Sequence, residues 1–476
     1  MLASHLNIPE IIYEADERFE KLYQCAWTLA SEHICKSDSL PVSPYMDEAC
    51  HPGRIWIWDT CFMALYCKYA NQVFPGIESL DNFYRMMYDG ASAGEIKIHH
   101  LDNPPLFAWV EYEYFQFTGD HDRIRRNLLE KKYLIRHYEW IENKARFCKK
   151  YPYAYMPSIL EKRDIGYLWS SCSSGMDNTP RGYGDAAALL YRVDILAQQA
   201  LSAEYIQKSA EIIGATEIAE HFKREYMEKV ALLNQYYYDE ADGFYYDIYA
   251  ANYEFCRFMT PASFWALLAE APDKKRAERM IRHLQDEKKF GGEIPIPSVS
   301  RDSSDFEPDG RYWRGSIWLP TSYMVLKSLE KYGKFDLAAD LAEKTVRHMA
   351  DVYERFMPHT IWECYSPTEI LPARNKDKNV FCRPDFCGWS ALGPISMMIE
   401  NILGFYGVDA VQNTLKYHHR RIPGKHGIRN FCFADVCCDI LIEENQVTIH
   451  TNNAFRMVVD GNVFEISVGE NHFELK

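Results

Sequence analysis

The chain lacks the features expected of a protein that crosses a membrane or binds nucleic acid. No run of about 18 apolar residues occurs, so no membrane-spanning helix is expected. Residues 1–13 contain no basic stretch followed by an apolar one, so no secretory signal is expected either. Basic residues are in deficit, with 53 Lys and Arg against 68 Asp and Glu and a net charge of −15. Because nucleic acids and anionic membranes attract basic surfaces, neither is expected as a partner.

Metal-binding spacings and short internal repeats are also missing. The 14 Cys are scattered through the chain, and Cys382/Cys387 and Cys432/Cys437/Cys438 have neither zinc-knuckle spacing nor a His at a regular offset. We interpret them as packing residues and expect reduced thiols in a cytoplasmic protein, with no metal and no cofactor. No crisp repeat indicates a helical solenoid. The sequence does not indicate an oligomeric state.

Aromatic residues, in contrast, are abundant. The chain contains 33 Tyr, 25 Phe and 11 Trp, or 14% of its 476 residues, within an otherwise ordinary globular composition. Some of these rings must form the core. Flat aromatic faces also bind the C–H-rich faces of sugar rings, so the excess is compatible with a carbohydrate site.

Most of the chain, residues 16–406, has a helical pattern. About a dozen segments show apolar residues at three- and four-residue steps, among them Ala186–Leu201, Pro261–Glu270, Ser316–Leu329 and Phe335–Tyr353. Long loops rich in aromatic residues separate them, at 47–58, 96–105, 169–184, 291–315 and 360–388. Long loops on a helical scaffold are usually functional, so the site is expected there.

The pattern changes near residue 410. Short, β-branched segments follow at Ile428–Val436, Asp439–Glu443, Gln446–His450, Phe455–Val459 and Val463–Val468. Turn residues separate them at 444–445, 452–453 and 460–462. We therefore predict a mainly α-helical domain at 1–409 and a small antiparallel β domain at 410–476.

Two carboxylates stand in settings that mark them for chemistry. Asp177 lies in the run SSGMDNTPR at 173–181, where Gly175 permits an irregular backbone and Pro180 stops a helix. Glu363 lies between aromatic residues, where burial would raise its pKa. Each has a plain alternative, because Asp177 could cap the helix that follows and Glu363 could be a surface residue in an aromatic turn. Glycoside hydrolysis needs two such carboxyl groups, one on each side of the scissile bond.

Six motifs occur in one order along the chain. They are Trp58-Asp59-Thr60, Asn103-Pro104-Pro105, SGMDNTPR at 174–181, YWRGSIW at 312–318, WECY at 362–365 and FCGWS at 386–390. This order resembles glycoside hydrolase family 63 and its relative, the family 37 trehalases. Small bacterial members acting on mannosylglycerate or glucosylglycerate are most similar in length. The resemblance covers residues 50–406, with further matches at 242–247 and 264–265.

The resemblance implies an (α/α)6 barrel and hydrolysis with inversion of the anomeric configuration. By the family pattern Asp177 is the general acid and Glu363 the general base. Asp59 would accept hydrogen bonds from sugar hydroxyls. The residues expected to bind substrate are Trp58, Asp59, Asn103, Gly175, Trp313, Arg314, Trp318, Tyr365 and Trp389. The expected activity is that of an exo-acting α-glycosidase on a small carbohydrate: an α-glucoside or α-mannoside such as a disaccharide, an oligosaccharide end or a glycerate conjugate.

Two positions depart from the family pattern. Asn103 stands where a Gln usually precedes the Pro-Pro pair, which shortens the amide side chain. Ser173 stands where the acid motif usually carries Glu. The missing carboxylate could change the pKa of Asp177, remove a substrate contact or signal a changed substrate. For inversion, the two carboxyl groups should stand roughly 6.5–9.5 Å apart with a water between them. Trp169 and Tyr183 are candidates for an apolar wall beside Asp177.

Several other residues admit both a functional and a structural role. His99 and His100 could line the site or lie in a plain turn. Arg54 and Arg181 could meet an anionic leaving group, although ion pairing within the protein is the commoner fate of an Arg. Asp194 is expected to face a neighbouring loop or helix, and Tyr112, Tyr114 and Phe115 are expected in the core.

Two rival functions remain open on sequence alone. A sugar 2-epimerase could share the barrel, but its chemistry uses paired His, and His99, His100 and His359 lack the required spread. A carbohydrate-binding relative without activity is the other, because Ser173 replaces the acidic neighbour of Asp177. Fold-level analogy does not separate these functions.

Overall fold

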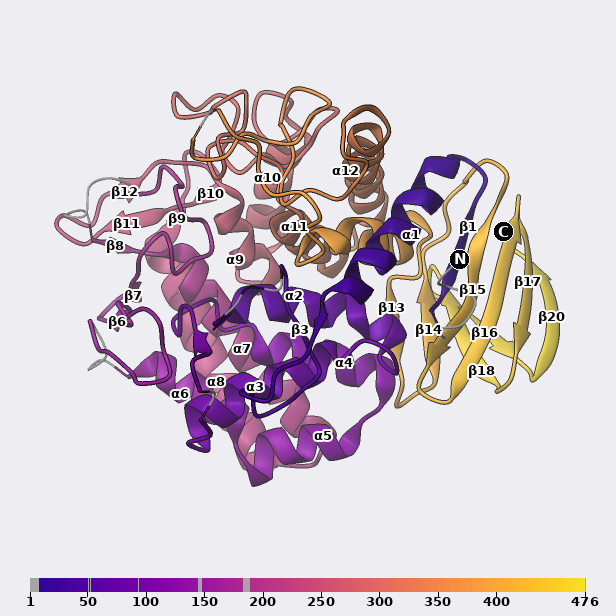
Figure 1. Ribbon diagram of the computed structural model, residues 1–476, viewed down its shortest axis with the longest axis horizontal. Helices are drawn as coiled ribbons and strands as arrows, with labels where there is room; N and C mark the ends of the chain where they lie inside the picture. The colour runs from indigo at the N-terminus through magenta and orange to yellow at the C-terminus, as the bar shows by residue number, and fades with distance from the viewer. Residues whose placement is uncertain are drawn as a thin grey trace.

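The computed structural model describes residues 8–49, 51, 53–92, 94–143, 148–182, 189–377 and 379–475. In Figure 1 the helices form one large body, and the C-terminal strands stand together at one side of it with the N-terminal strand β1 among them. Tyr183 lies outside the described residues. Within those ranges no helix combines the length and apolarity needed to span a membrane.

Two kinds of helix alternate along the chain. One kind exposes charged residues to solvent, at several positions in α1 (Glu17–Glu32), α8 (Thr216–Leu232), α10 (Lys274–Gln285) and α12 (Phe335–Arg355), and only at Arg85 in α3 (Gly76–Tyr88) and Glu139 in α6 (Tyr133–Glu142). The other kind has almost no exposed residue: α2 (Ile57–Cys67), α4 (Phe107–Thr118), α7 (Val193–Ile212), α9 (Phe264–Leu268), α11 (Leu319–Lys331) and η8 (Gly393–Ile402). A helix that is apolar on all sides is stable only inside a protein, so the second kind forms the centre of the helical body.

The central helices pack against one another in chain order. α2 contacts α4, α4 contacts α7, α7 contacts α9, α9 contacts α11, α11 contacts η8, and η8 contacts α2 again. Shorter helical segments connect them: α5 (His121–Arg125), η2 (Lys68–Ala70), η3 (Arg126–Glu130), η5 (Leu233–Tyr237), η6 (Pro261–Ser263) and η7 (Ser390–Leu392).

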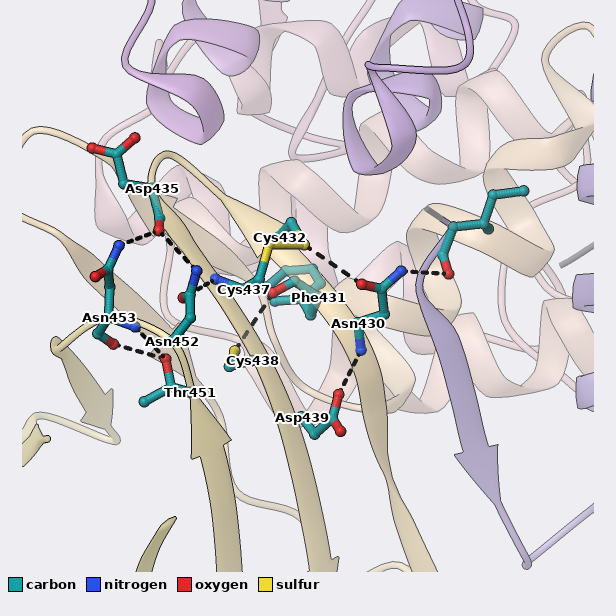
Figure 2. The surroundings of a disulfide bond; sticks show 11 residues. Asn430, Phe431, Cys432, Asp435, Cys437, Cys438, Asp439, Thr451, Asn452 and Asn453 are labelled. Carbon is teal, nitrogen blue, oxygen red and sulfur yellow. Dashed lines mark hydrogen bonds between the residues drawn. A yellow bond between two sulfur atoms is a disulfide. The ribbon is translucent and has the colours of Figure 1, made fainter. Parts of the chain in front are cut away.

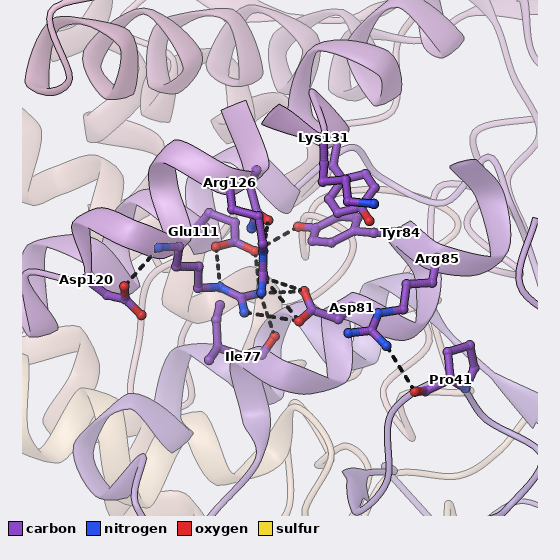
Figure 3. Close-up of polar contacts among 12 residues, drawn as sticks. Pro41, Ile77, Asp81, Tyr84, Arg85, Glu111, Asp120, Arg126 and Lys131 are labelled. Carbon is purple, nitrogen blue, oxygen red and sulfur yellow. Dashed lines mark hydrogen bonds and ion pairs between the residues drawn. The ribbon is translucent and has the colours of Figure 1, made fainter. Parts of the chain in front are cut away.

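A buried ion cluster joins three helices on one side of this body (Figure 3). The Arg123 guanidinium of α5 binds Glu111 of α4 at 2.7 Å and Asp81 of α3 at 3.1 Å. Tyr84 also donates a hydrogen bond to Glu111, at 3.0 Å. Its ion pairs and hydrogen bonds join side chains of α3, α4 and α5, so the cluster fixes how these helices pack.

The C-terminal strands form two sheets. One has the order β1-β15-β16-β17-β20, with β1 (Glu10–Tyr13), β15 (Lys425–Phe433), β16 (Val436–Glu443), β17 (Gln446–Thr451) and β20 (Gly469–Glu474). The other has the order β13-β14-β18-β19, with β13 (Gly407–Asp409), β14 (Thr414–Tyr417), β18 (Phe455–Val459) and β19 (Asn462–Ile466). The predicted strands and their three turns are confirmed, except that the first, predicted to continue to Val436, ends at Phe433. The expectation of a purely antiparallel domain is wrong, because β14 and β18 pair in parallel. The division of the chain at residue 410 stays a prediction, and β1 and β13 lie before it although they pair with strands beyond it.

Short strands occur in the loops of the helical body. They are β2 (Ile34–Cys35), β3 (Tyr45–Met46), β4 (Arg54–Ile55), β5 (Lys97–Ile98), β6 (Glu161–Lys162), β7 (Tyr167–Leu168), β8 (Leu190–Tyr191), β9 (Tyr238–Asp239), β10 (Phe244–Tyr245), β11 (Asp247–Tyr249) and β12 (Phe255–Cys256). The order β12-β11-β8-β7-β6 brings the segments before and after the Asp177 loop into one sheet.

One helix begins later than its sequence pattern predicts. The apolar periodicity predicts helix from residue 186, but α7 begins at Val193. The two residues of β8 pair with Ile248 and Tyr249 of β11, so sheet pairing prevails over the local pattern there. Residues 183–188 lie outside the described part of the chain. The predicted helices at 261–270, 316–329 and 335–353 are confirmed.

Cys432 and Cys437 form a disulfide, which corrects the expectation of reduced thiols for this pair (Figure 2). They are directly opposite residues in the β15–β16 pairing, with their Cα atoms 4.1 Å apart. Cysteines at this separation can be bridged without backbone movement. Cys438, one residue further on, is free and buried. Cytoplasmic location stays a prediction.

Candidate active site

The loop that carries Asp177 is irregular and well anchored. Residues 178–182 are not helical, so Asp177 does not cap a helix. The Asn178 side chain ties this loop to a second one, because its amide donates to the Arg311 carbonyl at 3.0 Å and its oxygen accepts from the Trp313 N–H at 2.8 Å. The Asp177 side chain itself remains partly exposed. Its Oδ2 accepts a 2.7 Å hydrogen bond from the Lys376 ammonium.

Gly175 lets the backbone of this loop lie against an indole ring. Its φ is +81°, in the left-handed region, and a Cβ added there would stand 3.1 Å from the Trp58 ring. Any larger residue would be strained and would clash with the ring. Trp58 is buried in α2, so its ring supports the acid loop from below.

Glu363 is buried and held at both ends. Its Oε1 accepts from the Tyr312 hydroxyl at 2.8 Å, and its Oε2 accepts from the Arg383 N–H at 3.2 Å. Its backbone carbonyl accepts from the Trp389 indole at 3.0 Å and from the Ser390 hydroxyl at 3.1 Å. Burial raises the pKa of Glu363, the two hydrogen bonds to its carboxylate oppose that change, and the negative charge of Asp177 adds to it. The alternative of a surface glutamate is therefore excluded.

Tyr312 connects the two carboxylates. Arg311 and Tyr312 both have positive φ, at 36° and 67°, in the segment that Asn178 clamps. From there the Tyr312 hydroxyl reaches Glu363, while the Lys376 ammonium that binds Asp177 lies 4.9 Å from the Tyr312 ring centroid. Asp177 and Glu363 are 186 positions apart in the sequence, and a few direct contacts connect their side chains. Sequence reasoning included Tyr312 in a motif without a role, and no signal pointed to Lys376.

Three more carboxylates lie close to this pair. Asp59 is buried, which raises its pKa well above the usual range, and the charges of Asp47, Glu363 and Asp177 raise it further. Burial and the charges of Asp59 and Asp47 likewise raise the pKa of Glu48. A group of carboxylates with raised pKa values around one point is typical of a catalytic site. Asp59 was predicted here, whereas Asp47 and Glu48 were not.

The predicted aromatic walls are mostly buried behind this site. Trp313 stacks on Trp318 with ring centroids 4.0 Å apart, and Trp318 has no exposed surface. Tyr365 is 1% exposed, and its hydroxyl accepts from the Trp362 N–H at 3.1 Å. These three residues support Tyr312 and Glu363 from behind.

The other predicted binding residues also have protein partners. The Trp389 and Trp318 ring centroids are 5.6 Å apart, and the Trp389 indole donates a hydrogen bond to the Glu363 carbonyl. The Arg314 side chain binds the Asn178 carbonyl at 2.8 Å and Asp305 at 2.7 Å. Asn103 donates to the Ser173 carbonyl at 3.2 Å, and its side-chain oxygen is buried without a partner.

Arg181 is not available to an anionic leaving group. It is 2% exposed and forms ion pairs with Asp194 at 2.7 Å and Asp247 at 3.0 Å. This confirms the expectation that Asp194 faces the protein. Burying an Arg with two carboxylates is favourable only when they compensate its charge, so the cluster anchors the end of the acid loop.

Arg54 and the two histidines lie beside an exposed tyrosine. The Arg54 guanidinium stacks over the Tyr155 ring at 3.8 Å, and the His99 ring stacks on the same ring at 5.2 Å. Burial lowers the pKa of His100, while the charges of Asp102 and Asp177 oppose that change. His100 therefore lies near the acid, and Arg54 remains beside the site. Of the predicted core residues, Phe115 is buried, while Tyr112 and Tyr114 are partly buried against the core.

A second carboxylate pair lies elsewhere and has no catalytic geometry. Burial raises the pKa of Glu330 to about 7, while Glu400, although burial opposes it, has its pKa lowered to about 2 chiefly by Lys327 and Lys68. Such a split can mark an acid and a base. Here the Lys327 ammonium sits between them, 2.5 Å from Glu330 and 2.9 Å from Glu400. The pair is therefore part of an ion network in which one ammonium binds both carboxylates.

Comparison with known proteins agrees with the site. A family model described as "Mannosylglycerate hydrolase MGH1-like glycoside hydrolase domain" matches residues 55–377, about two thirds of the chain. The chain belongs to this MGH1-like glycoside hydrolase family. It is an enzyme, and the resemblance to family 63 and the trehalases is confirmed. Asp59, Asp177 and Glu363 all lie within the matched residues.

Individual relatives of this MGH1-like chain extend the comparison. An uncharacterized protein of Borreliella burgdorferi is 28% identical over 72% of this chain and 70% of its own length. A probable mannosyl-oligosaccharide glucosidase of Schizosaccharomyces pombe is 27% identical over 56% of this chain, which spans about a third (34%) of that longer protein.

Two solved structures share the fold of this glycoside hydrolase. The family 63 mannosylglycerate hydrolase of Thermus thermophilus aligns with a TM-score of 0.59 at 19% identity, covering 79% of this chain and 100% of its own. The neutral trehalase of Saccharomyces cerevisiae aligns with a TM-score of 0.55 at 15% identity, covering 74% and 72%. At these identities the likeness shows the fold alone. Among the described residues no cluster of His, Cys, Asp and Glu suited to a metal occurs.

Removing the Tyr312 hydroxyl should move the acid limb of the pH profile. The hydrogen bond from Tyr312 lowers the pKa of Glu363, so Tyr312→Phe raises it further. A base must be ionised, and the acid limb of kcat/KM should therefore shift upward by about one pH unit, with an activity loss of about tenfold below it. Measuring kcat/KM from about pH 4 to about pH 8 checks this. Tyr236→Phe, at an exposed site, should leave the profile unchanged. An unshifted acid limb in Tyr312→Phe would contradict the contact.

A buried histidine behind the base loop should make the fold acid-sensitive. His348 of α12 donates to the Ser366 carbonyl at 2.9 Å, and burial lowers its pKa from 6.5 to about 4. Between these values the unfolded chain takes up a proton that the folded chain does not, so stability is lost as pH falls. At about pH 5 this amounts to about 2 kcal/mol. Urea unfolding at about pH 7.5 and about pH 5 should show this loss in the native chain and a smaller one in His348→Gln. An equal loss in both would show that another group is responsible.

Proposed function

We propose that this glycoside hydrolase is an inverting, exo-acting α-glycosidase with Asp177 as general acid and Glu363 as general base. The observation that carries the proposal is the connection between the two loops. Asn178 beside the acid clamps the segment from which Tyr312 binds the base. Inverting hydrolysis requires two carboxyl groups that flank the scissile bond. The charge of Asp177 raises the pKa of Glu363, which supports placing the two groups in one site.

We further propose that the helices close into an (α/α)6 barrel. Six central helices, from α2 to η8, contact their neighbours in chain order, and the last contacts the first. Each alternates with a solvent-facing helix, and the fold shared with a family 63 hydrolase and a trehalase supports this arrangement. The long loops that carry Asp59, Asp177 and Glu363 would then meet at one end of the barrel.

The reaction follows from these positions. Asp177 gives its proton to the glycosidic oxygen as the bond to the anomeric carbon breaks. Glu363 takes a proton from a water that attacks that carbon from the opposite face, so the product has inverted configuration. Asp177 Oδ2 accepts a hydrogen bond from the Lys376 ammonium, so the glycosidic oxygen must displace this ammonium to reach that atom.

Asp59 and Trp58 are the residues we propose for the sugar. Asp59 is buried beside both catalytic groups, where its oxygens could accept hydrogen bonds from hydroxyls. The Trp58 indole N–H is buried without a partner, so it is available as a donor. Trp313, Trp318 and Tyr365 would act through Tyr312 and Glu363, since they expose almost no surface. Arg314, Gly175 and Asn103 would shape the loops.

The substrate class we propose is a small α-mannoside or α-glucoside, with glycerate conjugates favoured. The family description names mannosylglycerate hydrolase, and a longer relative is named as a mannosyl-oligosaccharide glucosidase. The Lys376 ammonium, once released from Asp177, would be available to a carboxylate of the leaving group. Family membership favours hydrolysis over the epimerase and non-catalytic alternatives.

The test is a panel of α-mannosides and α-glucosides followed by proton NMR. The panel includes α-mannosylglycerate, α-glucosylglycerate and neutral α-linked disaccharides. Release of the β-anomer first from an α-substrate is the expected result. Release of the α-anomer first would overturn the inverting assignment. Epimerised sugar without cleavage, or binding without release, would overturn the hydrolase proposal.

The positive charge of Lys376 should favour substrates whose leaving group carries a carboxylate over substrates with a neutral leaving group. Lys376→Met should raise KM for α-mannosylglycerate by about fivefold, the usual worth of an exposed ion pair. A neutral α-mannobiose should be unaffected, and Lys376→Arg should keep the preference. Equal changes on both substrates would exclude a role of Lys376 in reading the leaving group.

A further inference from the structure

A buried carboxylate lies against Ser173, four residues before Asp177. The Ser173 hydroxyl donates to Asp102 Oδ1 at 3.1 Å. Asp102 is 0% exposed and comes from a loop 71 residues earlier in the chain. The Asp177 loop is therefore bound by a carboxylate that another segment supplies.

Asp102 holds the start of the acid loop through several atoms. Its Oδ2 accepts from the Ile159 N–H at 2.9 Å, and its backbone carbonyl accepts from the Trp169 indole at 2.9 Å. Ser173 in turn accepts a 2.9 Å hydrogen bond from the Ser170 hydroxyl. Because the buried Asp102 carboxylate accepts from both the Ile159 N–H and the Ser173 hydroxyl, it fixes the position of these two groups.

The neighbouring residue completes the hold on Ser173. Asn103 donates from its side-chain amide to the Ser173 carbonyl at 3.2 Å. Side chain and backbone of Ser173 are thus both bound by the 102–103 segment. Four residues further along the chain stands Asp177, and Gly175 between them lies on the Trp58 ring. The loop is held by polar contacts before Gly175 and by Asn178 after it.

We propose that Asp102 is a positioning residue for the general acid. The proposal rests on the assignment of Asp177 as the acid. Asp102 touches no reacting atom in this arrangement. Its carboxylate acts through Ser173 on the placement of Asp177, so its loss weakens protonation of the leaving group and spares the attack by water.

Substrates with different leaving groups separate positioning from general damage. An α-glycosyl fluoride needs no proton on its leaving group, whereas an alkyl α-glycoside does. In Asp102→Ser, kcat/KM should fall about 100-fold on α-mannosylglycerate, the usual effect of misplacing a catalytic group. On α-mannosyl fluoride it should stay within about threefold of the native chain. If the substrate panel selects a glucoside, α-glucosylglycerate and α-glucosyl fluoride replace these two probes. Equal losses on both probes would overturn the proposal, because general loss of structure affects both.

Exchanging the two residues tests whether the carboxylate or the particular position matters. The double variant Asp102→Ser with Ser173→Asp conserves total volume and keeps one hydroxyl facing one carboxylate. It should recover at least about tenfold of the activity on the glycoside relative to Asp102→Ser alone. If the double variant recovers no activity, the proposal that a carboxylate paired with a hydroxyl at positions 102 and 173 places Asp177 is overturned.

Two controls keep the outcomes distinct. Asp102→Asn, which keeps the shape and loses the charge, should show the same glycoside-specific loss if Asp102→Ser unfolds at the assay temperature. Asp177→Asn is measured in parallel. If Asp177→Asn spares glycoside hydrolysis, the assignment of the acid fails. If Asp177→Asn behaves as expected while Asp102→Asn matches the native chain on both probes, only the role of Asp102 fails.

Discussion

Replacing Glu363 by Gln should lower kcat by at least about 1,000-fold on both α-glycosides and α-glycosyl fluorides. Glu363 is the buried carboxylate whose oxygens accept from Tyr312 and Arg383. Gln cannot take a proton from the attacking water, and that step is common to both substrate types. The amide has nearly the same shape, so the thermal unfolding midpoint should change little.

An external nucleophile makes the Glu363 result specific. In Glu363→Ala, added azide should attack in place of the activated water and give the β-glycosyl azide from an α-substrate. Glu369→Gln, at an exposed position on the same loop, is the matched control and should be fully active. Activity of Glu363→Gln within tenfold of the native chain would show that the base lies elsewhere.

Asp177→Asn should lose about 1,000-fold in kcat on α-glycosides while hydrolysis of α-glycosyl fluorides stays within about tenfold. The asparagine has no proton to give to a sugar oxygen, whereas fluoride leaves without one. The ion pair with Lys376 is lost in this variant, and because both side chains are substantially exposed its loss should cost little stability.

The matched control for the acid is Asp302→Asn, an exposed carboxylate on another loop, which should be fully active. Equal losses of Asp177→Asn on glycosides and fluorides would indicate a role in binding or in water activation. Near-native activity on glycosides would show that the acid assignment is wrong.

Local pattern predicted the elements whose contacts are close in sequence. The strands from 428 onward pair with their immediate neighbours through short turns, so alternation and turn residues were enough to predict them. The long helices α11 and α12 followed from apolar periodicity in the same way. The start of α7 did not, because its first predicted residues include β8, which pairs with residues some 60 positions away.

The site illustrates the same limit. Asp177 and Glu363 could be named because a set of motifs occurs in one order, although neither residue is distinctive locally. The contacts of Tyr312 with Glu363, of Lys376 with Asp177 and of Asp102 with Ser173 join positions 51, 199 and 71 residues apart. Such contacts leave no periodic trace in a sequence.

The sequence by itself determined a mainly helical chain with a β-rich end and a glycoside hydrolase family, and it predicted two carboxylates for the chemistry. Those conclusions rest on composition, on local periodicity and on the order of motifs. All three are properties of the sequence and do not depend on how the chain folds. Only the tertiary structure decided that Arg181 serves the scaffold, that Trp318 has no exposed surface, and that the Asp102 carboxylate lies against Ser173. Burial and hydrogen bonding depend on which distant segments meet, and packing of the whole chain sets them.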